Sequence, residues 1–183
     1  MSKPTKEKAR ELIEEAWRRR RESSEVALDK SERPYAELRN LLSEAAAIGR
    51  EINDQSVLSV ALRRLGHTYL DFDQHEEARA LMAQALLAAN QSEDSCAIAH
   101  TIRHLGDVEF AAEQLDAAEK HYAEALALFR AQVNPPALDF ANALRAMAIL
   151  KEKTESRDEA NQLWAEARPL YSMAGIEGDL EAT

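Results

Sequence analysis

The chain has 183 residues, of which 45% are hydrophobic and 31% charged, with a formal net charge of −10. This length suits one domain with a hydrophobic core, and the hydrophobic content argues against a disordered chain. The sequence holds 34 alanines and 22 leucines against only five glycines and five prolines. Because alanine and leucine favour helices while glycine and proline break them, the composition indicates packed helices.

Net charge and cysteine usage restrict the compartment and the partners. A net charge of −10 argues against a general nucleic-acid binder, whose affinity requires a basic surface. The single cysteine, Cys96, cannot form a disulfide within the chain, which suggests a reducing compartment and leads us to expect a cytoplasmic protein. The residues after Met1 lack the apolar stretch of a signal peptide, and no apolar run is long enough to predict a membrane span. We therefore expect neither nucleic acid nor a membrane as a partner.

The charge is distributed unevenly along the sequence. Residues 1–30 carry a balance of +2, which includes the run Arg18–Arg21, and the remaining residues carry −12. Such a run could attach the chain to nucleic acid or to a membrane surface. We favour a solvated helix face instead, because acidic residues flank the run at helical neighbour spacing, namely Glu14, Glu15, Glu22 and Glu25.

A pattern of about 40 residues repeats along the chain. Residues 61–66 (ALRRLG) recur as residues 101–106 (TIRHLG), and a third copy follows 42 residues later at 143–148 (ALRAMA). A second block, which begins at Glu77 in the first copy, recurs in step at Ala117 and Glu159. Three copies and one divergent leading copy are visible, which is typical of a repeat architecture.

Each copy reads as two helices joined by a short turn. Leu62, Leu65 and Tyr69 lie on one helical stripe, and a second stripe begins at Ala78. We expect Asp73 to cap the second helix, with Glu76 three residues later completing a capping box.

Small residues recur where the two helices of a copy would meet. Without large side chains at these positions, the two backbones can approach closely. We expect three small residues of the first helices to face three alanines of the second helices, namely Gly66, Gly106 and Ala148 against Ala78, Ala118 and Ala160.

These residues resemble the tetratricopeptide repeat (TPR) family over about residues 31–175, in the Leu-Gly pairs, the small residues and the bulky residues Met82, Tyr122 and Trp164. The 40- to 42-residue spacing is similar to kinesin-light-chain repeats. The resemblance implies an all-α, right-handed α-α superhelix (TPR solenoid) of about four helix-turn-helix units, which serves as a non-enzymatic protein-interaction scaffold. We expect a single domain with a divergent helix pair at 1–54, repeats at 55–94, 95–134 and 135–175, and a tail at 176–183.

Repeats of this class bind partners along a groove formed by their first helices. On a helical wheel, each first helix has one side that carries the packing stripe and another side that does not. We expect the second side to face the groove. One arginine per repeat falls on this side (Arg63, Arg103 and Arg145). Kinesin-light-chain-like repeats carry asparagines at these or the directly following positions. Because guanidinium groups bind carboxylates bidentately, we expect an extended or acidic peptide there. The predicted peptide-binding residues are Val60, Arg63, Arg64, His67, Leu70, His100, Arg103, His104, Asp107, Phe110, Asn142, Arg145 and Ile149.

Other kinds of chemistry have weaker support in the sequence. No phosphate-binding loop, dinucleotide fingerprint, nucleophile elbow or paired-cysteine zinc pattern is present, and we expect no catalytic residue, metal or cofactor. Cys96 and His100 could form a thiolate–imidazole pair, although a half-buried thiol at a helix start is the preferred interpretation. His67, His100, His104 and Asp107 could hold a transition metal, but neighbouring arginines would repel it. The alternative function is a homodimeric regulatory or sensory protein of this family that uses its groove or an uncovered terminal face for self-association.

Overall fold

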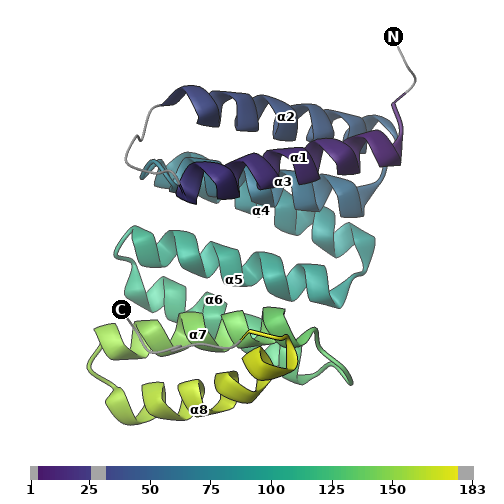
Figure 1. Cartoon of the computed structure of the whole chain (residues 1–183). Helices are drawn as coiled ribbons and strands as arrows, with labels where there is room; N and C mark the ends of the chain where they lie inside the picture. Colours follow the sequence, from purple (N-terminus) through teal and green to yellow (C-terminus); the bar gives the residue numbers. More distant parts are fainter. Residues whose placement is uncertain (1–3, 26–31, 177–183) are drawn as a thin grey trace. The chain divides into compact units, whose positions relative to one another are not determined.

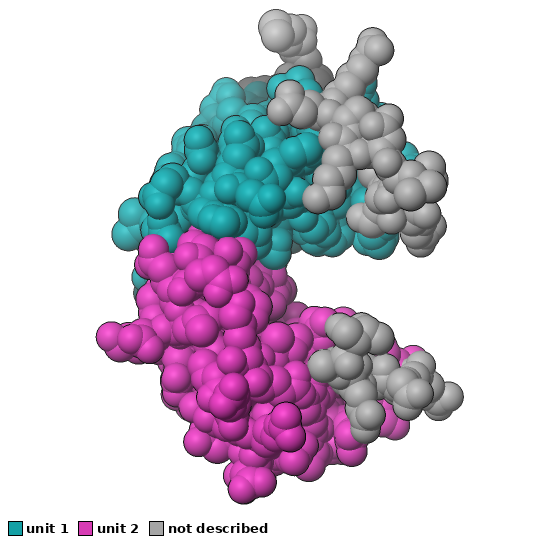
Figure 2. Space-filling view, turned by 90° about the vertical axis from the view of Figure 1, so that its left-hand side faces the viewer, with its two compact units in different colours: residues 1–97 teal, residues 98–183 magenta. Residues whose placement is uncertain are grey.

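The computed structural model describes residues 4–25 and 32–176. Within these residues the chain forms eight α-helices and no strand, which confirms the predicted all-α class. The chain divides into two compact units, residues 1–97 (unit 1) and residues 98–183 (unit 2; Figure 2). The helices are α1 (Lys6–Glu25), α2 (Glu32–Glu51), α3 (Gln55–Leu70), α4 (His75–Ser92), α5 (Ser95–Ala111), α6 (Leu115–Arg130), α7 (Ala137–Lys153) and α8 (Arg157–Met173).

The first helix of each predicted repeat begins close to the predicted boundary. Helices α3 and α5 begin at Gln55 and Ser95, and α7 begins at Ala137, two residues after the expected start. The predicted tail lies outside the described residues except for Ile176. In the part of the chain that the structure describes, no helix combines the length and the apolar character needed to cross a membrane.

In unit 1 each helix packs on the next, α1 on α2, α2 on α3 and α3 on α4, and α1 also contacts α3 (Figure 1). The shared core includes Leu12, Leu38, Leu42 and Leu62, all of which are buried. In unit 2, α7 packs on both α6 and α8. Its core includes Phe129 and Phe140, whose ring centroids lie 5.9 Å apart. Amphipathic helices of this kind are stable only because their neighbours cover the apolar stripe.

Three of the four arginines in the run of α1 are paired with acidic groups, two of them with a flanking glutamate as expected. Arg18 and Arg19 both bind Glu15, which lowers the pKa of that carboxyl through their hydrogen bonds. Arg20 instead reaches the end of α3, where its Nε and Nη2 donate to Asp71 at 2.9 and 2.7 Å. This bidentate pair joins α1 to the α3–α4 turn within unit 1.

The turns between helices contain a feature that sequence analysis interpreted wrongly. Asp73 does not cap α4; its φ is +56°, in the left-handed region, and the N-cap position is Gln74, with no side-chain capping bond. The same conformation recurs at every short turn, at the non-glycine residues Asn53, Asp73, Glu93, Glu113 and Glu155.

At four of these turns, the next N–H closes the end of the helix by donating to a carbonyl five residues back. Gln114 donates to Glu109 at 2.8 Å, and Ser156 donates to Lys151 at 2.8 Å. Gln74 donates in the same way to Tyr69 at 3.1 Å, and Asp54 to Gly49 at 2.9 Å. This is the Schellman closure, which requires one left-handed residue, so Asp73 terminates α3 instead of starting α4.

Gly66 lies against Ala78 as predicted, whereas Gly106 lies against Tyr122 and not against the expected Ala118. A Cβ on Gly66 would lie 3.3 Å from the carbonyl oxygen of Ala78 and 3.1 Å from Met82 Cε. A Cβ on Gly106 would lie 2.5 Å from two ring carbons of Tyr122. The aromatic ring of α6 therefore occupies space on α5 that only glycine leaves open.

We expect Gly106→Ala to destabilise the protein by about 1–2 kcal/mol. Alanine gains about 1 kcal/mol of helix propensity, but overpacking costs roughly 1–3 kcal/mol, and a Cβ at 2.5 Å from a buried ring places the cost in the upper half of that range. Denaturant unfolding measures the change. Gly66→Ala is the matched control and should lose less, because the end of the Met82 side chain can move. A Gly106→Ala protein as stable as the wild type would contradict this packing.

We expect Glu155→Gly to stabilise the protein by about 0.5–1 kcal/mol. Glu155 is exposed and left-handed, and glycine adopts this conformation without the penalty of roughly 1–2 kcal/mol that a Cβ brings. Gln162→Gly, on the exposed face of α8, should instead lose about 1 kcal/mol because it weakens a helix interior. Thermal and denaturant unfolding compare the two variants, and a loss of stability in both would contradict the assigned turn.

Candidate functional site

The predicted peptide-binding residues lie on three helices. Val60, Arg63, Arg64, His67 and Leu70 are on α3 in unit 1. The remaining predicted residues are on α5 and α7 in unit 2. Each unit is therefore considered separately.

Unit 2 contains a hollow of about 230 Å³ between α5 and α7, with Tyr122 of α6 at its base. It brings together six of the predicted residues and adds Tyr122 and Ala146. We call this the unit 2 hollow; it is lined by Arg103, Asp107, Phe110, Tyr122, Asn142, Arg145, Ala146 and Ile149.

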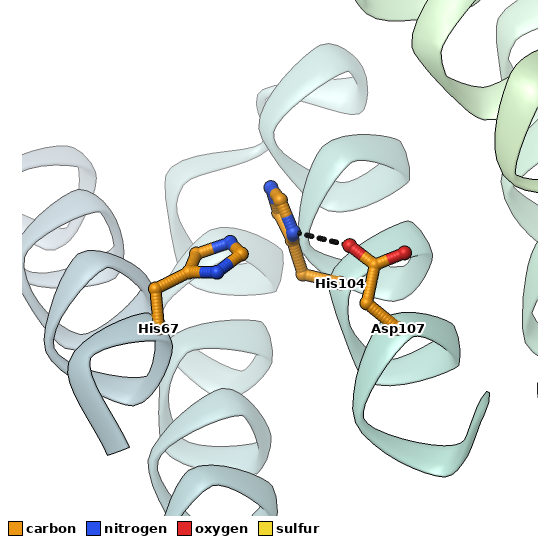
Figure 3. A group of neighbouring side chains, drawn as sticks. All are labelled: His67, His104 and Asp107. Atoms are coloured by element: carbon orange, nitrogen blue, oxygen red, sulfur yellow. Dashed lines mark hydrogen bonds and ion pairs between the residues drawn. The ribbon is translucent and has the colours of Figure 1, made fainter. Parts of the chain in front are cut away.

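Asp107 is the centre of the polar contacts in this hollow. Arg103 Nη1 donates to its Oδ2 at 2.9 Å, and Tyr122 Oη donates to its Oδ1 at 3.0 Å. Figure 3 shows the third contact, His104 Nδ1 at 2.8 Å from Oδ2. Burial raises the pKa of the Asp107 carboxyl, while the Arg103 charge and the Tyr122 hydroxyl act to lower it. The carboxyl thus already has a cation and a hydroxyl donor bound to it.

Two tyrosines hold polar groups of the hollow in place. Burial, together with the neighbouring Asp107, raises the pKa of Tyr122, so this phenol stays a neutral donor. Tyr171 of α8 donates to Asn142 Oδ1 at 2.8 Å, and burial raises its pKa as well. Because the Asn142 oxygen is engaged, its amide N–H groups remain available as donors toward the hollow.

Arg145 differs from Arg103 in its surroundings. Arg103 is only 12% exposed and is bound to Asp107, whereas Arg145 is exposed. Among residues 4–25 and 32–176, Arg145 forms no hydrogen bond or ion pair. Phe110 and Ile149, both half-buried, supply the apolar part of the wall, and Lys153 lies 5.0 Å from the Phe110 ring centroid. The hollow therefore offers one unpaired guanidinium beside an amide and apolar surface.

In unit 1, Arg64 and His67 contact the first helix. Arg64 Nη1 donates to the carbonyl of Ile13 at 3.2 Å, and its guanidinium carbon lies 4.9 Å from the Trp17 ring centroid. His67 contacts the same indole edge-on, with ring centroids 5.9 Å apart. Val60 lines a separate hollow between α1 and α3, while Arg63 and Leu70 are half-buried. Arg64 and His67 thus join α1 to α3.

The histidines of unit 2 are engaged with neighbouring side chains. His104 is buried and stacks on His100 at 4.8 Å, and His100 Nδ1 lies 3.8 Å from Asp139 Oδ1. A metal ion at His104 and Asp107 would meet the Arg103 guanidinium, which already binds that carboxylate. Cys96 is half-buried near the start of α5, which agrees with its expected environment.

Tyr122 is a residue of the candidate site that the sequence analysis missed, since we assigned it only to helix packing. The equivalent positions in the other repeats hold Met82 and Trp164, and the Trp164 Nε1 also donates to a carboxylate, that of Glu152, at 2.7 Å. A polar tip on a buried aromatic residue usually requires a partner, and this signal was available in the sequence.

Comparisons with known proteins agree with the helical repeat fold. A family model described as Tetratricopeptide repeat matches residues 95–173. Among curated proteins, none matches the sequence of this chain.

Several solved structures share the fold at low sequence identity. The apo form of RapI matches with a TM-score of 0.73 and 15% identity over 92% of this chain and 57% of its own length. A Rap protein complexed with Competence and Sporulation Factor matches with a TM-score of 0.69 and 18% identity, over 75% of this chain and 38% of its own. A Podosopora anserina protein described as a kinesin light chain with nearly identical TPR-like repeats matches with a TM-score of 0.62 and 15% identity, over 97% and 81%.

The present chain spans little more than half of RapI and less than half of the complexed Rap protein. The matched repeats and the shared helix-pair fold nevertheless give the same assignment. Residues 95–173 of this chain match the tetratricopeptide repeat family, and the chain shares the α-α superhelical repeat fold of the similar solved structures.

Proposed function

We propose that this chain is a protein-interaction scaffold whose unit 2 hollow binds an acidic segment of a partner protein. The observation that carries the proposal is Arg145, an exposed guanidinium without a hydrogen bond or ion pair among the described residues, at the wall of an apolar hollow. An arginine in this setting can take a carboxylate bidentately without first breaking an internal ion pair.

The groups around Arg145 support an anionic ligand with an apolar part. The Asn142 amide, oriented by Tyr171, offers a second donor next to the guanidinium. Phe110 and Ile149 offer apolar contact for a neighbouring side chain of the ligand. Ligand sites commonly combine an apolar lining with a few fixed polar groups of this kind.

The three arginines of the predicted ladder take different roles in this proposal. Arg145 contacts the ligand carboxylate, while Arg103 stays bound to Asp107 and adds positive potential from within the hollow. Asp107 positions Arg103 and is itself held by Tyr122. Arg63, in unit 1, is half-buried and stays a predicted binding residue.

The comparisons support binding as the activity. One neighbour was solved in complex with Competence and Sporulation Factor, and stacked helical repeats generally present extended binding surfaces. We propose that this chain likewise acts by binding and not by catalysis, in the cytoplasm.

We expect Arg145→Glu to weaken binding of an acidic peptide at least tenfold. The substitution removes the bidentate donor and places a like charge opposite the ligand, and a tenfold change corresponds to about 1.4 kcal/mol. The probe is a fluorescein-labelled peptide of alternating Glu and Leu residues, measured by fluorescence anisotropy at low and high salt. Affinity should also fall with added salt, because the charges are exposed.

Arg157→Glu is the matched control, since it changes the net charge equally at an exposed position outside the hollow. It should bind the peptide like the wild type, and a peptide of alternating Lys and Leu should bind neither protein. Equal loss in both variants would mean that only net charge matters, and unchanged affinity of Arg145→Glu would exclude the proposed contact.

A homodimer is the second candidate function. Met173, at the end of α8, is 78% exposed, and Ile176 follows it at 39%. Exposed apolar side chains at a chain's last described helix favour contact with a partner surface. Sedimentation velocity over a hundredfold range of concentration should show a dimer that Met173→Glu weakens, whereas a monomer throughout would exclude this candidate.

A further inference from the structure

We infer a second binding site in unit 1, between α1 and α3, that takes an apolar side chain of a peptide next to an acidic residue. A hollow of about 310 Å³ lies there, a volume at the lower end of ligand pockets. It is independent of the unit 2 hollow and includes α1, a helix without repeat signature. We call it the unit 1 hollow; it is lined by Arg10, Ile13, Glu14, Ser56, Val57 and Val60.

The floor of the unit 1 hollow is apolar. Ile13 and Val57 are buried, at 3% and 4% exposure, and Val60 is half-buried. At the position of Val60, the two later repeats carry His100 and Asn142, which are polar. A ligand side chain that covers this floor gains free energy in proportion to the apolar area that it removes from water.

The charges at the rim favour a carboxylate beside that side chain. Arg10 is exposed and forms no hydrogen bond or ion pair within the described part of the chain. Two acidic groups near it are engaged elsewhere: Glu14 lies 3.3 Å from Arg64 Nη1, and Asp54 binds Lys6 at 2.6 Å. Glu7, three residues before Arg10, forms no ion pair with it, so the Arg10 guanidinium can bind a ligand carboxylate without first breaking one.

The openness of the hollow favours a peptide over a fatty acid, which also combines an apolar chain with a carboxylate. Ser56 and Arg10, on opposite helices of the hollow, are both exposed. One leucine-sized side chain would reach the floor, whereas the outer methylenes of a long acyl chain would stay in water and gain little. A peptide backbone tolerates that water, and the Ser56 hydroxyl can bond to it.

The two helices that form this hollow are fixed to each other, so it exists before a ligand binds. Arg64 of α3, one helical turn after Val60, donates to the carbonyl of Ile13, itself a residue of the floor, at 3.2 Å. Trp17 of α1 lies between two guanidiniums, with Arg20 at 4.7 Å and Arg64 at 4.9 Å from its ring centroid. A preformed site avoids much of the ordering cost of binding.

Nuclear magnetic resonance titration of the full ¹⁵N-labelled chain tests the inference. The probe is acetyl-Leu-Glu-amide, and the readout is the shift of the amides of Ser56, Val57 and Val60. We expect saturable shifts that acetyl-Leu-Lys-amide does not produce. Ser56→Trp, which fills the hollow from an exposed position, should weaken binding at least tenfold, and Ser56→Ala is its matched control. Arg10→Glu should weaken binding similarly without adding bulk.

Three results would overturn the inference. These amides could fail to shift, they could shift equally with the Leu-Lys probe, or octanoate could bind them more tightly than the peptide does. Arg145→Glu separates this site from the unit 2 hollow: the unit 1 shifts should persist in that variant. Loss of peptide binding at one hollow therefore leaves the result at the other unchanged.

Discussion

Close approach of the two helices in each pair is the constraint on which the rest of this structure depends. A helix with an apolar stripe gains stability only when a neighbour covers the stripe, and here the neighbour comes near enough because glycine or alanine occupies the contact. At Gly106 the space is filled by the Tyr122 ring, which a Cβ would meet at 2.5 Å. The same contact brings the Tyr122 hydroxyl to Asp107, so helix packing and the polar centre of the unit 2 hollow share one residue.

Much of this fold was predictable, because it follows from periodic side-chain sizes. The recurrence of ALRRLG as TIRHLG and ALRAMA set the helix pairs in register, and the helix starts at Gln55 and Ser95 agree with that register. The turns were less predictable. Asp73 and Glu76 form a capping-box pattern, but the Schellman closure of the preceding helix required Asp73 to adopt a left-handed conformation. Local capping preference contributes about 1 kcal/mol, so packing and turn geometry can override it.

The contacts of the hollow were predictable only in part. A helical wheel places Arg103 and Arg145 at equivalent positions, yet one is bound to a half-buried carboxylate and the other is exposed. The sequence contains the reason, because Asp107 follows Arg103 by four residues on the same helix face, whereas Ile149 stands at that position after Arg145. The contacts of Tyr122 with Asp107 and of Tyr171 with Asn142 run between helices, and no one-helix pattern contains them. Arg64 shows the same limit. The repeat register alone assigns its side chain to the binding face, but in the structure this side chain packs on Trp17 of the divergent first helix.

The left-handed residues also explain the length of the repeat. They stand at 53, 73, 93 and 113, so the turn inside a repeat and the turn between repeats share a left-handed residue and one spacing of 20 residues. The α6–α7 connection breaks this sequence: six residues, including Pro135 and Pro136, join Arg130 to Ala137, where two join α4 to α5. The third repeat consequently starts 42 residues after the second, not 40. The structural unit that repeats in this chain is thus a single helix with its turn. The sequence shows a repeat of two helices because two kinds of helix, with different side chains, alternate along the chain.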